Sequence, residues 1–202
     1  WSASAVSLLP PPAAAKAVHS AHSASSTPRL TGAGACEIAH ALHCASALRV
    51  LWLSGNRLGD QGGAALAEAL PSLGWLERGC QLEELWLSSA ALGDGAATAL
   101  AAALPKLTKL RKVDLRFNRV QDEGALALAA AMPALAALSE LYLQDNLVGD
   151  AGAAGIAQSL PSCPWLIELR LGGNRIGDGG AAALAAALPR CALRGLRLGA
   201  NC

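Results

Sequence analysis

Cysteine and histidine side chains, which could together bind a metal ion, gather in one short stretch of this sequence. That stretch contains Cys36, His40, His43 and Cys44. Their spacing fits no standard zinc pattern, and the chain has no CxxC pair. We also find no Ser/His/Asp order, no phosphate-binding glycine loop between a strand and a helix, and no paired carboxylates outside helix starts. We therefore expect no metal, cofactor, catalytic residue or small-molecule substrate, and no enzymatic activity.

Aromatic and charged residues recur beside pairs of leucines in segments of the form LxxLxLxxN. Trp52 lies between Leu51 and Leu53, for example. Because side chains alternate across a strand, the leucines should face a core and the residues around them the opposite side. Exposed Trp, Tyr and Arg in one patch are typical of protein-binding surfaces. The candidate partner-binding residues are Trp52, Glu84, Trp86, Lys112, Asp114, Arg116, Tyr142, Arg170 and Arg197.

These segments belong to a repeated phrase. Complete copies begin at Leu48, Leu82, Leu110, Leu138 and Leu166, and a further copy opens at Leu193. The period is 28 residues, except that the first copy carries an insertion around residues 77–81. A fixed period of this length is typical of a solenoid, in which each unit buries its core only by stacking on its neighbours. The stacked segments should form a parallel sheet.

The remainder of each copy predicts a turn and a helix. An Asn follows the strand in most copies and should form a hydrogen-bonded ladder, with a defect where Ala90 replaces it. An Asp then suits the N-cap of a helix, where it would accept free N–H groups. Leucines four apart should face inward, and a proline ends each helix. The Asp and Pro residues are Asp60, Asp94, Asp122, Asp150, Asp178, Pro71, Pro105, Pro133, Pro161 and Pro189.

The phrase LxxLxLxxNxLGDxGAxALAxAL resembles the leucine-rich repeat of the ribonuclease-inhibitor type. The resemblance implies an α/β leucine-rich repeat solenoid, or horseshoe, with the parallel sheet on the concave face and helices on the convex face. Members of that family include the arrays of NOD-like receptors and Ran GTPase-activating proteins. A repeat alone assigns none of their functions.

Across neighbouring strands about 4.8 Å apart, Trp52 and Trp86 can touch. Glu84, Lys112 and Glu140 could form a ladder of charges in the same way. The alternative is that the aromatic rings only stack on one another and the charges only keep the sheet hydrated.

The composition argues against nucleic acid and membrane as binding partners. The chain has 16 Lys+Arg against 15 Asp+Glu, so it lacks the basic character of a general nucleic-acid binder. No apolar run is long enough to predict a membrane span. The six cysteines favour free thiols in a reducing, cytoplasmic setting, although a Cys163–Cys191 disulfide stays open as an alternative. We expect a protein partner on the concave face, without nucleic acid or membrane.

Two regions are expected along the chain. Residues 1–31 are Ala/Ser/Pro-rich and predict a disordered segment. The segment could be an interdomain linker or untranslated sequence wrongly included in the protein, and its composition weakly resembles a transit peptide. Residues 32–202 predict the leucine-rich repeat array with partial first and last repeats, and the strand preceding the helical stretch at 32–42 is not recognisable. The start at Trp1 and the end within a repeat suggest a fragment.

The leading functional hypothesis is a protein–protein interaction module in a larger cytosolic regulatory or innate-immune-type protein. The alternative is a GTPase activator resembling Ran GTPase-activating protein. Arg57, Arg119 and Arg175 follow the repeated Asn, and an arginine can stabilise a transferring phosphoryl group. Their recurrence at one repeat position favours a role in the scaffold instead.

Overall fold

The computed structural model describes residues 5–7, 29–42, 45, 47–72 and 80–201. Within them the chain alternates strands and helices. The strands are β1 (Ala5–Ser7), β2 (Val50–Trp52), β3 (Glu84–Trp86), β4 (Lys112–Asp114), β5 (Glu140–Tyr142), β6 (Glu168–Arg170) and β7 (Gly195–Arg197). The helices are α1 (Gly32–Leu42), α2 (Gly59–Ala69), α3 (Asp94–Ala103), α4 (Asp122–Ala131), α5 (Asp150–Ser159) and α6 (Asp178–Ala187).

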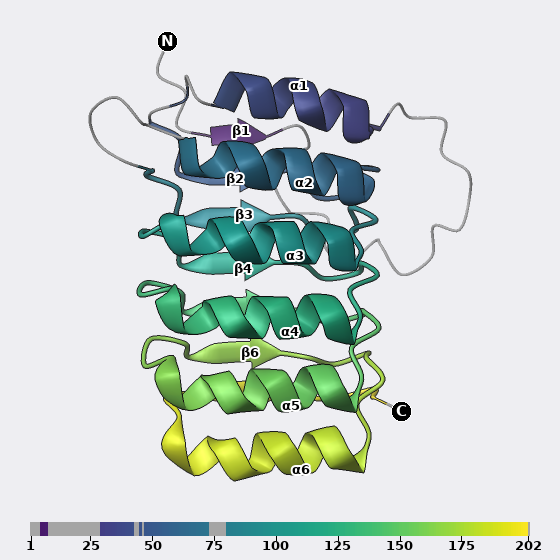
Figure 1. The fold of residues 1–202 in the computed structure, drawn as a ribbon, viewed down its shortest axis with the longest axis vertical. Coiled ribbons are helices and arrows are strands. Elements are labelled where there is room, and N and C mark those ends of the chain that lie inside the picture. The colour runs from purple at the N-terminus through teal and green to yellow at the C-terminus, as the bar shows by residue number, and fades with distance from the viewer. Residues whose placement is uncertain (1–4, 8–28, 43–44, 46, 73–79, 202) are drawn as a thin grey trace.

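The strands form one parallel sheet in chain order from β1 to β7, and the helices stack in the same order on one face of it (Figure 1). This is the α/β leucine-rich repeat solenoid expected from the sequence, and its open sheet fits a horseshoe. A short 3-10 turn containing the predicted proline follows each helix from α2 to α6. The prolines therefore mark the helix ends, as expected.

The core lies between the sheet and the helices. The middle residue of each strand from β2 to β6 is buried, as are the leucines that flank it in the repeat. The helical leucine pairs are buried with them, for example Leu66 with Leu70 and Leu100 with Leu104. Leu188 departs from this pattern, because 41% of its surface is exposed in the last repeat. Each unit therefore buries its apolar residues against its neighbours.

The Asn ladder is present where it was predicted. Asn146 shows the pattern, since its Oδ1 accepts from Val120 N–H and its Nδ2 donates to the carbonyls of Leu115 and Leu143. Buried amides thus satisfy backbone groups in two adjacent repeats. Ala90 has no side-chain amide to form the hydrogen bonds of the ladder, and its backbone carbonyl instead accepts a hydrogen bond from Gly59 N–H. The ladder defect is therefore bridged by the main chain.

The predicted role of the repeated Asp as the N-cap of its own helix is wrong. Asp94, Asp122, Asp150 and Asp178 are the first residues of their helices, and no described N-cap side chain makes a capping bond. Asp122 Oδ1 instead accepts from Gly149 N–H at 2.6 Å and Gly152 N–H at 2.9 Å, at the start of α5. The carboxylate therefore caps the helix of the next repeat.

This capping also explains the glycines of the GDxG phrase. A Cβ at Gly152 would come within 2.8 Å of Asp122 Oδ1, and one at Gly180 would come equally close to Asp150 Oδ1. These contacts are too short for a side chain, so the approaching carboxylate requires a residue without Cβ. The repeated Asp and the glycines of the next repeat together link successive helices.

Three residues of the segment 1–31, for which the sequence predicts disorder, form a strand. Ala5–Ser7 forms β1 and pairs with β2, in the place of the strand that the first helix lacked in the sequence. Leu30 donates its N–H to Asn56 Oδ1, so the array also begins before residue 32. Residues 1–4 and 8–28, and most of the 77–81 insertion, lie outside the described residues.

Candidate functional site

The candidate site is the face of the sheet opposite the helices, which we call the open face. It carries the first and third residues of β2 to β7, because the middle residue of each three-residue strand points into the core. The register pairs Trp52 with Trp86, Asp114 with Tyr142, and Arg170 with Arg197. The predicted alignment of the candidate residues is therefore confirmed.

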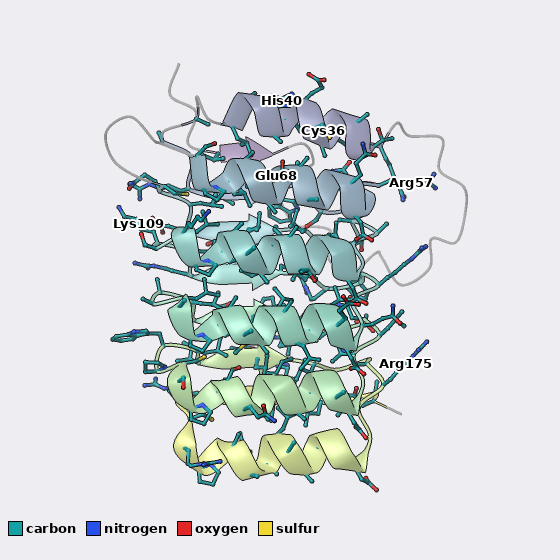
Figure 2. All side chains as sticks on the ribbon, in the orientation of Figure 1. Cys36, His40, Arg57, Glu68, Lys109 and Arg175 are labelled. Carbon is teal, nitrogen blue, oxygen red and sulfur yellow. The ribbon has the colours of Figure 1, made fainter. Side chains whose placement is uncertain are left out.

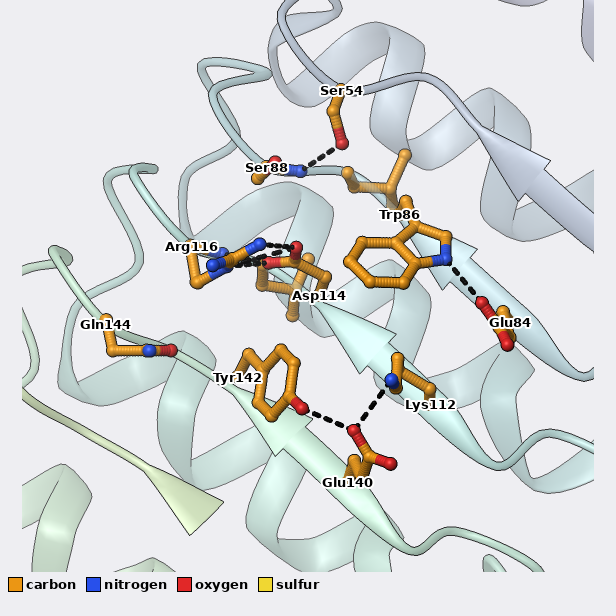
Figure 3. A network of polar contacts seen from close by, with 12 residues as sticks. Ser54, Glu84, Trp86, Ser88, Lys112, Asp114, Arg116, Glu140, Tyr142 and Gln144 are labelled. Atoms are coloured by element: carbon orange, nitrogen blue, oxygen red, sulfur yellow. Dashed lines mark hydrogen bonds and ion pairs between the residues drawn. The ribbon is translucent and has the colours of Figure 1, made fainter. Parts of the chain in front are cut away.

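Two tryptophans lie at the β2–β3 end of the open face. The rings of Trp52 and Trp86 stack with centroids 5.1 Å apart and planes 13° apart. Trp86 Nε1–H donates to Glu84 Oε2 at 2.8 Å, which fixes the indole in place (Figure 3). Both tryptophans remain partly exposed. A pair of this kind offers a flat apolar surface with little side-chain entropy left to lose.

Lys112 connects the tryptophans to the middle of the sheet. Its Nζ lies 5.2 Å from the centre of the Trp86 ring and 5.6 Å from that of Tyr142, within the range of cation–π attraction. The same Nζ forms a 2.8 Å ion pair with Glu140 Oε2. The predicted ladder is thus formed between Lys112 and Glu140, whereas the bond shown for Glu84 goes to Trp86.

Glu140 also accepts a hydrogen bond from the Tyr142 hydroxyl. Burial disfavours the ionised Glu140 carboxyl, but the bonds from Lys112 and Tyr142 outweigh it and lower the pKa of Glu140. Burial and the adjacent Glu140 carboxylate together raise the pKa of Tyr142. Glu140 is therefore ionised and Tyr142 neutral near pH 7.

Asp114 is not the exposed contact residue that the sequence suggested. Its side chain is 0% exposed and is bound by Arg116, whose Nη2 lies 2.6 Å from Asp114 Oδ2 and whose Nε lies 2.9 Å from Oδ1. This hydrogen bonding raises the pKa of Arg116. The register places Asp114 on the open face, but the neighbouring side chains cover it. It positions Arg116 and is closed to direct contact with a partner.

Tyr142 is likewise covered, with 6% of its surface exposed. The Arg116 guanidinium lies 5.5 Å from its ring centre and that of Arg170 lies 4.4 Å away. Together with Lys112, these cations surround the ring. The prediction of Tyr142 as an exposed anchor is therefore wrong, and it acts as the centre around which three cations are arranged.

The β6–β7 end of the open face carries two arginines and one carboxylate. Arg170 Nη2 lies 2.7 Å from Glu168 Oε1, and Arg197 Nε lies 3.6 Å from the same atom. Arg197 is the more exposed of the two arginines. Of the nine candidate residues, Asp114 and Tyr142 are buried, Arg197 is exposed and the other six are partly buried.

Three residues outside the candidate list also shape the open face. Glu140 and Glu168 bind its cations, and Gln144 has a buried Oε1 that, within the described residues, has no hydrogen-bond partner. The sequence placed Glu140 in the charge ladder, and Glu168 opens the next strand beside the candidate Arg170 in the same way. Gln144 follows the second leucine of its repeat, as Arg116 does, so its position also offered a signal.

The structure describes only some of the cysteines and histidines for which the sequence raised a metal site or a disulfide. Within the described residues, no three His, Cys, Asp or Glu side chains gather as a metal site. Cys36 and His40 lie on α1, whereas His43 and Cys44 fall outside the described residues (Figure 2). Cys36, Cys80, Cys163 and Cys191 are free thiols, so the Cys163–Cys191 disulfide is not formed. Among the described helices, none has the length and apolarity needed to span a bilayer.

Comparisons with known proteins agree with this geometry. The family described as Leucine Rich repeat matches residues 46–67, 106–129 and 162–185. No curated protein matches the chain by sequence. Among solved structures, the chain is similar to Leiomodin-1 Actin-Binding Site 2 (ABS2), with a TM-score of 0.58 and 18% identity over 77% of this chain and 86% of that chain. At this identity the likeness shows the fold. The family match at these three places and the structural likeness both agree with a leucine-rich repeat fold.

Proposed function

We propose that this protein is an interaction module that binds a protein partner through the open, concave face of its sheet. The observation that carries the proposal is the stacked pair of Trp52 and Trp86, which is partly exposed although 47 apolar residues pack into the core. Anchoring aromatics in a patch held rigid by neighbouring groups are typical of binding hot spots.

The polar network supports the same proposal. Each cation beside Tyr142 has an acidic partner on the open face: Glu140 for Lys112, Asp114 for Arg116 and Glu168 for Arg170. Because these side chains are held by bonds to one another, a partner would meet a face that needs little ordering on association. The face has the features of a pre-formed interface, whereas nothing in it supplies a nucleophile next to a base.

We further propose that the array resembles the ribonuclease-inhibitor type and works in a cytosolic regulatory or innate-immune-type protein. A helix in every complete repeat supports the first point, and the four free thiols among the described residues are consistent with a reducing compartment. The GTPase-activator alternative is not favoured. Arg57, Arg119 and Arg175 are exposed at equivalent turns, and no comparison links them to catalysis.

The test replaces Trp52 and Trp86 together with Ala. The actin-binding title of the similar structure makes purified monomeric actin the first defined probe, followed by proteins captured from native lysate and identified by mass spectrometry. A partner that uses this face should lose at least about 2 kcal/mol of binding free energy, or roughly 30-fold in Kd. Leu126→Ala, which removes an exposed leucine from α4 on the other side of the sheet, serves as the control.

Circular dichroism should remain unchanged in both variants. Equal recovery of every partner by the double variant would contradict binding through the open face. Loss of binding in the Leu126→Ala control alone would place the interface on the helices.

A further inference from the structure

A second surface lies at the edge of the sheet where the strands begin. Its side chains come from the residues just before β2 to β6, so it is separate from the open face. Two adjoining hollows of about 380 and 370 Å³ open there and share Arg111 and Ala137 in their walls. The first is also lined by Arg49, Gln81, Glu83, Thr108 and Lys109, and the second by Ala136, Ser139 and Trp165.

Positive charge dominates the first hollow. Arg49 has an acidic partner, Glu83, whose Oε1 lies 3.4 Å from its Nη1. Lys109 bonds the neutral Gln81 side chain, and the Arg111 side chain makes no ion pair or hydrogen bond with another described residue. Among the described residues, these two cations therefore have no carboxylate partner. This differs from the open face, where Lys112, Arg116 and Arg170 are each paired with an acid.

The second hollow adds an apolar contact to this charge. Trp165 has 61% of its surface exposed, the highest value among the large hydrophobic residues described as exposed. Ile167, with 39% exposed, is two residues further along the same edge, and its N–H donates to the carbonyl of Ser139, which lines the hollow. Ala136, Ala137 and Ser139 are small, so an apolar side chain of a ligand can reach the indole beside Arg111.

We propose that this edge binds an acidic peptide segment of a protein partner, with carboxylates on Lys109 and Arg111 and a following apolar side chain on Trp165. The segment would run across the strand ends. Two strand spacings separate the start of β4, beside Lys109 and Arg111, from the start of β6, beside Trp165, or about 10 Å, which about three extended residues span. Charge complementarity selects the acidic part of the segment and the exposed indole selects the apolar part.

The test uses a fluorescein-labelled hexapeptide of three glutamates, one serine and two leucines, titrated with the full chain and followed by anisotropy. One comparison peptide replaces the glutamates with lysines and another replaces the leucines with serines. The acidic-apolar peptide should bind at least about tenfold more tightly than either. Its affinity should fall as salt is raised, because the contacts with Lys109 and Arg111 are exposed to solvent.

Arg111→Glu should weaken binding of this peptide at least tenfold, and Trp165→Ala should remove the preference for leucines over serines. Arg175→Glu is the matched control, since Arg175 is exposed on the side of the stack opposite Lys109 (Figure 2). The double replacement of Trp52 and Trp86 by Ala should leave peptide binding unchanged, which separates this site from the open face.

Three results would overturn the proposal. The first is no preference for the acidic-apolar peptide up to about 1 mM protein. The second is equal weakening by Arg111→Glu and Arg175→Glu. The third is tighter binding of a labelled oligothymidylate that is lost in Arg111→Glu, because that would identify the edge as a nucleic-acid site.

Discussion

The carboxylate that links successive helices can be removed at a single position, Asp122. Asp122→Ala takes away the acceptor of Gly149 N–H and Gly152 N–H and leaves the start of α5 without its side-chain cap. Asp178 occupies the same place in α6, but within the described residues it accepts no hydrogen bond. Asp178→Ala is therefore a matched control that removes the same side chain from its own helix without removing a link between repeats.

The expected magnitude follows from these contacts. Loss of a capping carboxylate costs about 1–2 kcal/mol, since two charge-assisted bonds at a helix N-terminus disappear. Each variant also loses an acidic residue from the first turn of its own helix, worth about 0.3–1 kcal/mol. Asp122→Ala should thus lower the free energy of unfolding by at least about 1 kcal/mol more than Asp178→Ala does. For a chain of this length that corresponds to roughly 2–4 °C in Tm.

Urea unfolding followed by circular dichroism gives the difference in stability. Because repeat arrays can unfold in parts, hydrogen exchange at the Gly149 and Gly152 amides supplies the local readout. Both amides should exchange faster in Asp122→Ala and at the parental rate in Asp178→Ala. If the two variants lost equal stability and left these amides equally protected, the carboxylate would act within its own helix and the inter-repeat explanation would be refuted.

Two further outcomes follow from individual residues. Phe117 has a φ of 56° and is 50% exposed. Phe117→Gly should therefore relieve left-handed backbone strain and raise the free energy of unfolding by about 0.5–1 kcal/mol, as measured by urea titration. An unchanged or lower unfolding midpoint would contradict this. Burial raises the pKa of the Cys163 thiol to about 11. Its alkylation by iodoacetamide at pH 8, measured by mass spectrometry, should therefore be about 100-fold slower than that of a thiol of pKa 9. The alkylation rate should increase as the pH rises toward 11. Because that pKa is raised, the stabilisation from burying the neutral thiol is complete below about pH 9 and is lost between about pH 9 and 11; rapid labelling of the folded protein at pH 8 would contradict it.

The repeat was sufficient to predict the strands, their register and the inward leucines. Alternation around Leu51 and Leu53 determines which side chains face the core, and a constant period aligns Trp52 with Trp86. The Asn ladder followed from the same period. The strand and its inward leucines depend on geometry within one repeat, whereas the register and the ladder follow because the same unit recurs at a constant period.

The features that sequence reasoning missed depend on contacts between copies or on side-chain packing. An Asp at a helix start is compatible with capping its own helix, and only the packing of neighbouring helices brings the carboxylate to the start of the next one. Asp114 was correctly placed on the open face, yet Arg116 and its neighbours cover it. β1 was missed because Ala5–Ser7 lacks the paired leucines by which every other strand is recognised.

The two proposed surfaces differ in the physical basis of recognition. On the open face, breaking an ion pair such as Arg116–Asp114 would leave a buried carboxylate unpaired, so these charges fix the shape of the face and are costly to recruit for a partner. Recognition there must depend mainly on the partly exposed tryptophans and should respond weakly to salt. At the strand-start edge, Lys109 and Arg111 are exposed and have no acidic partner in the described part of the chain, so their attraction for a ligand is available and is screened by salt. One rigid repeat scaffold therefore presents an apolar surface and a charged surface that can be occupied independently.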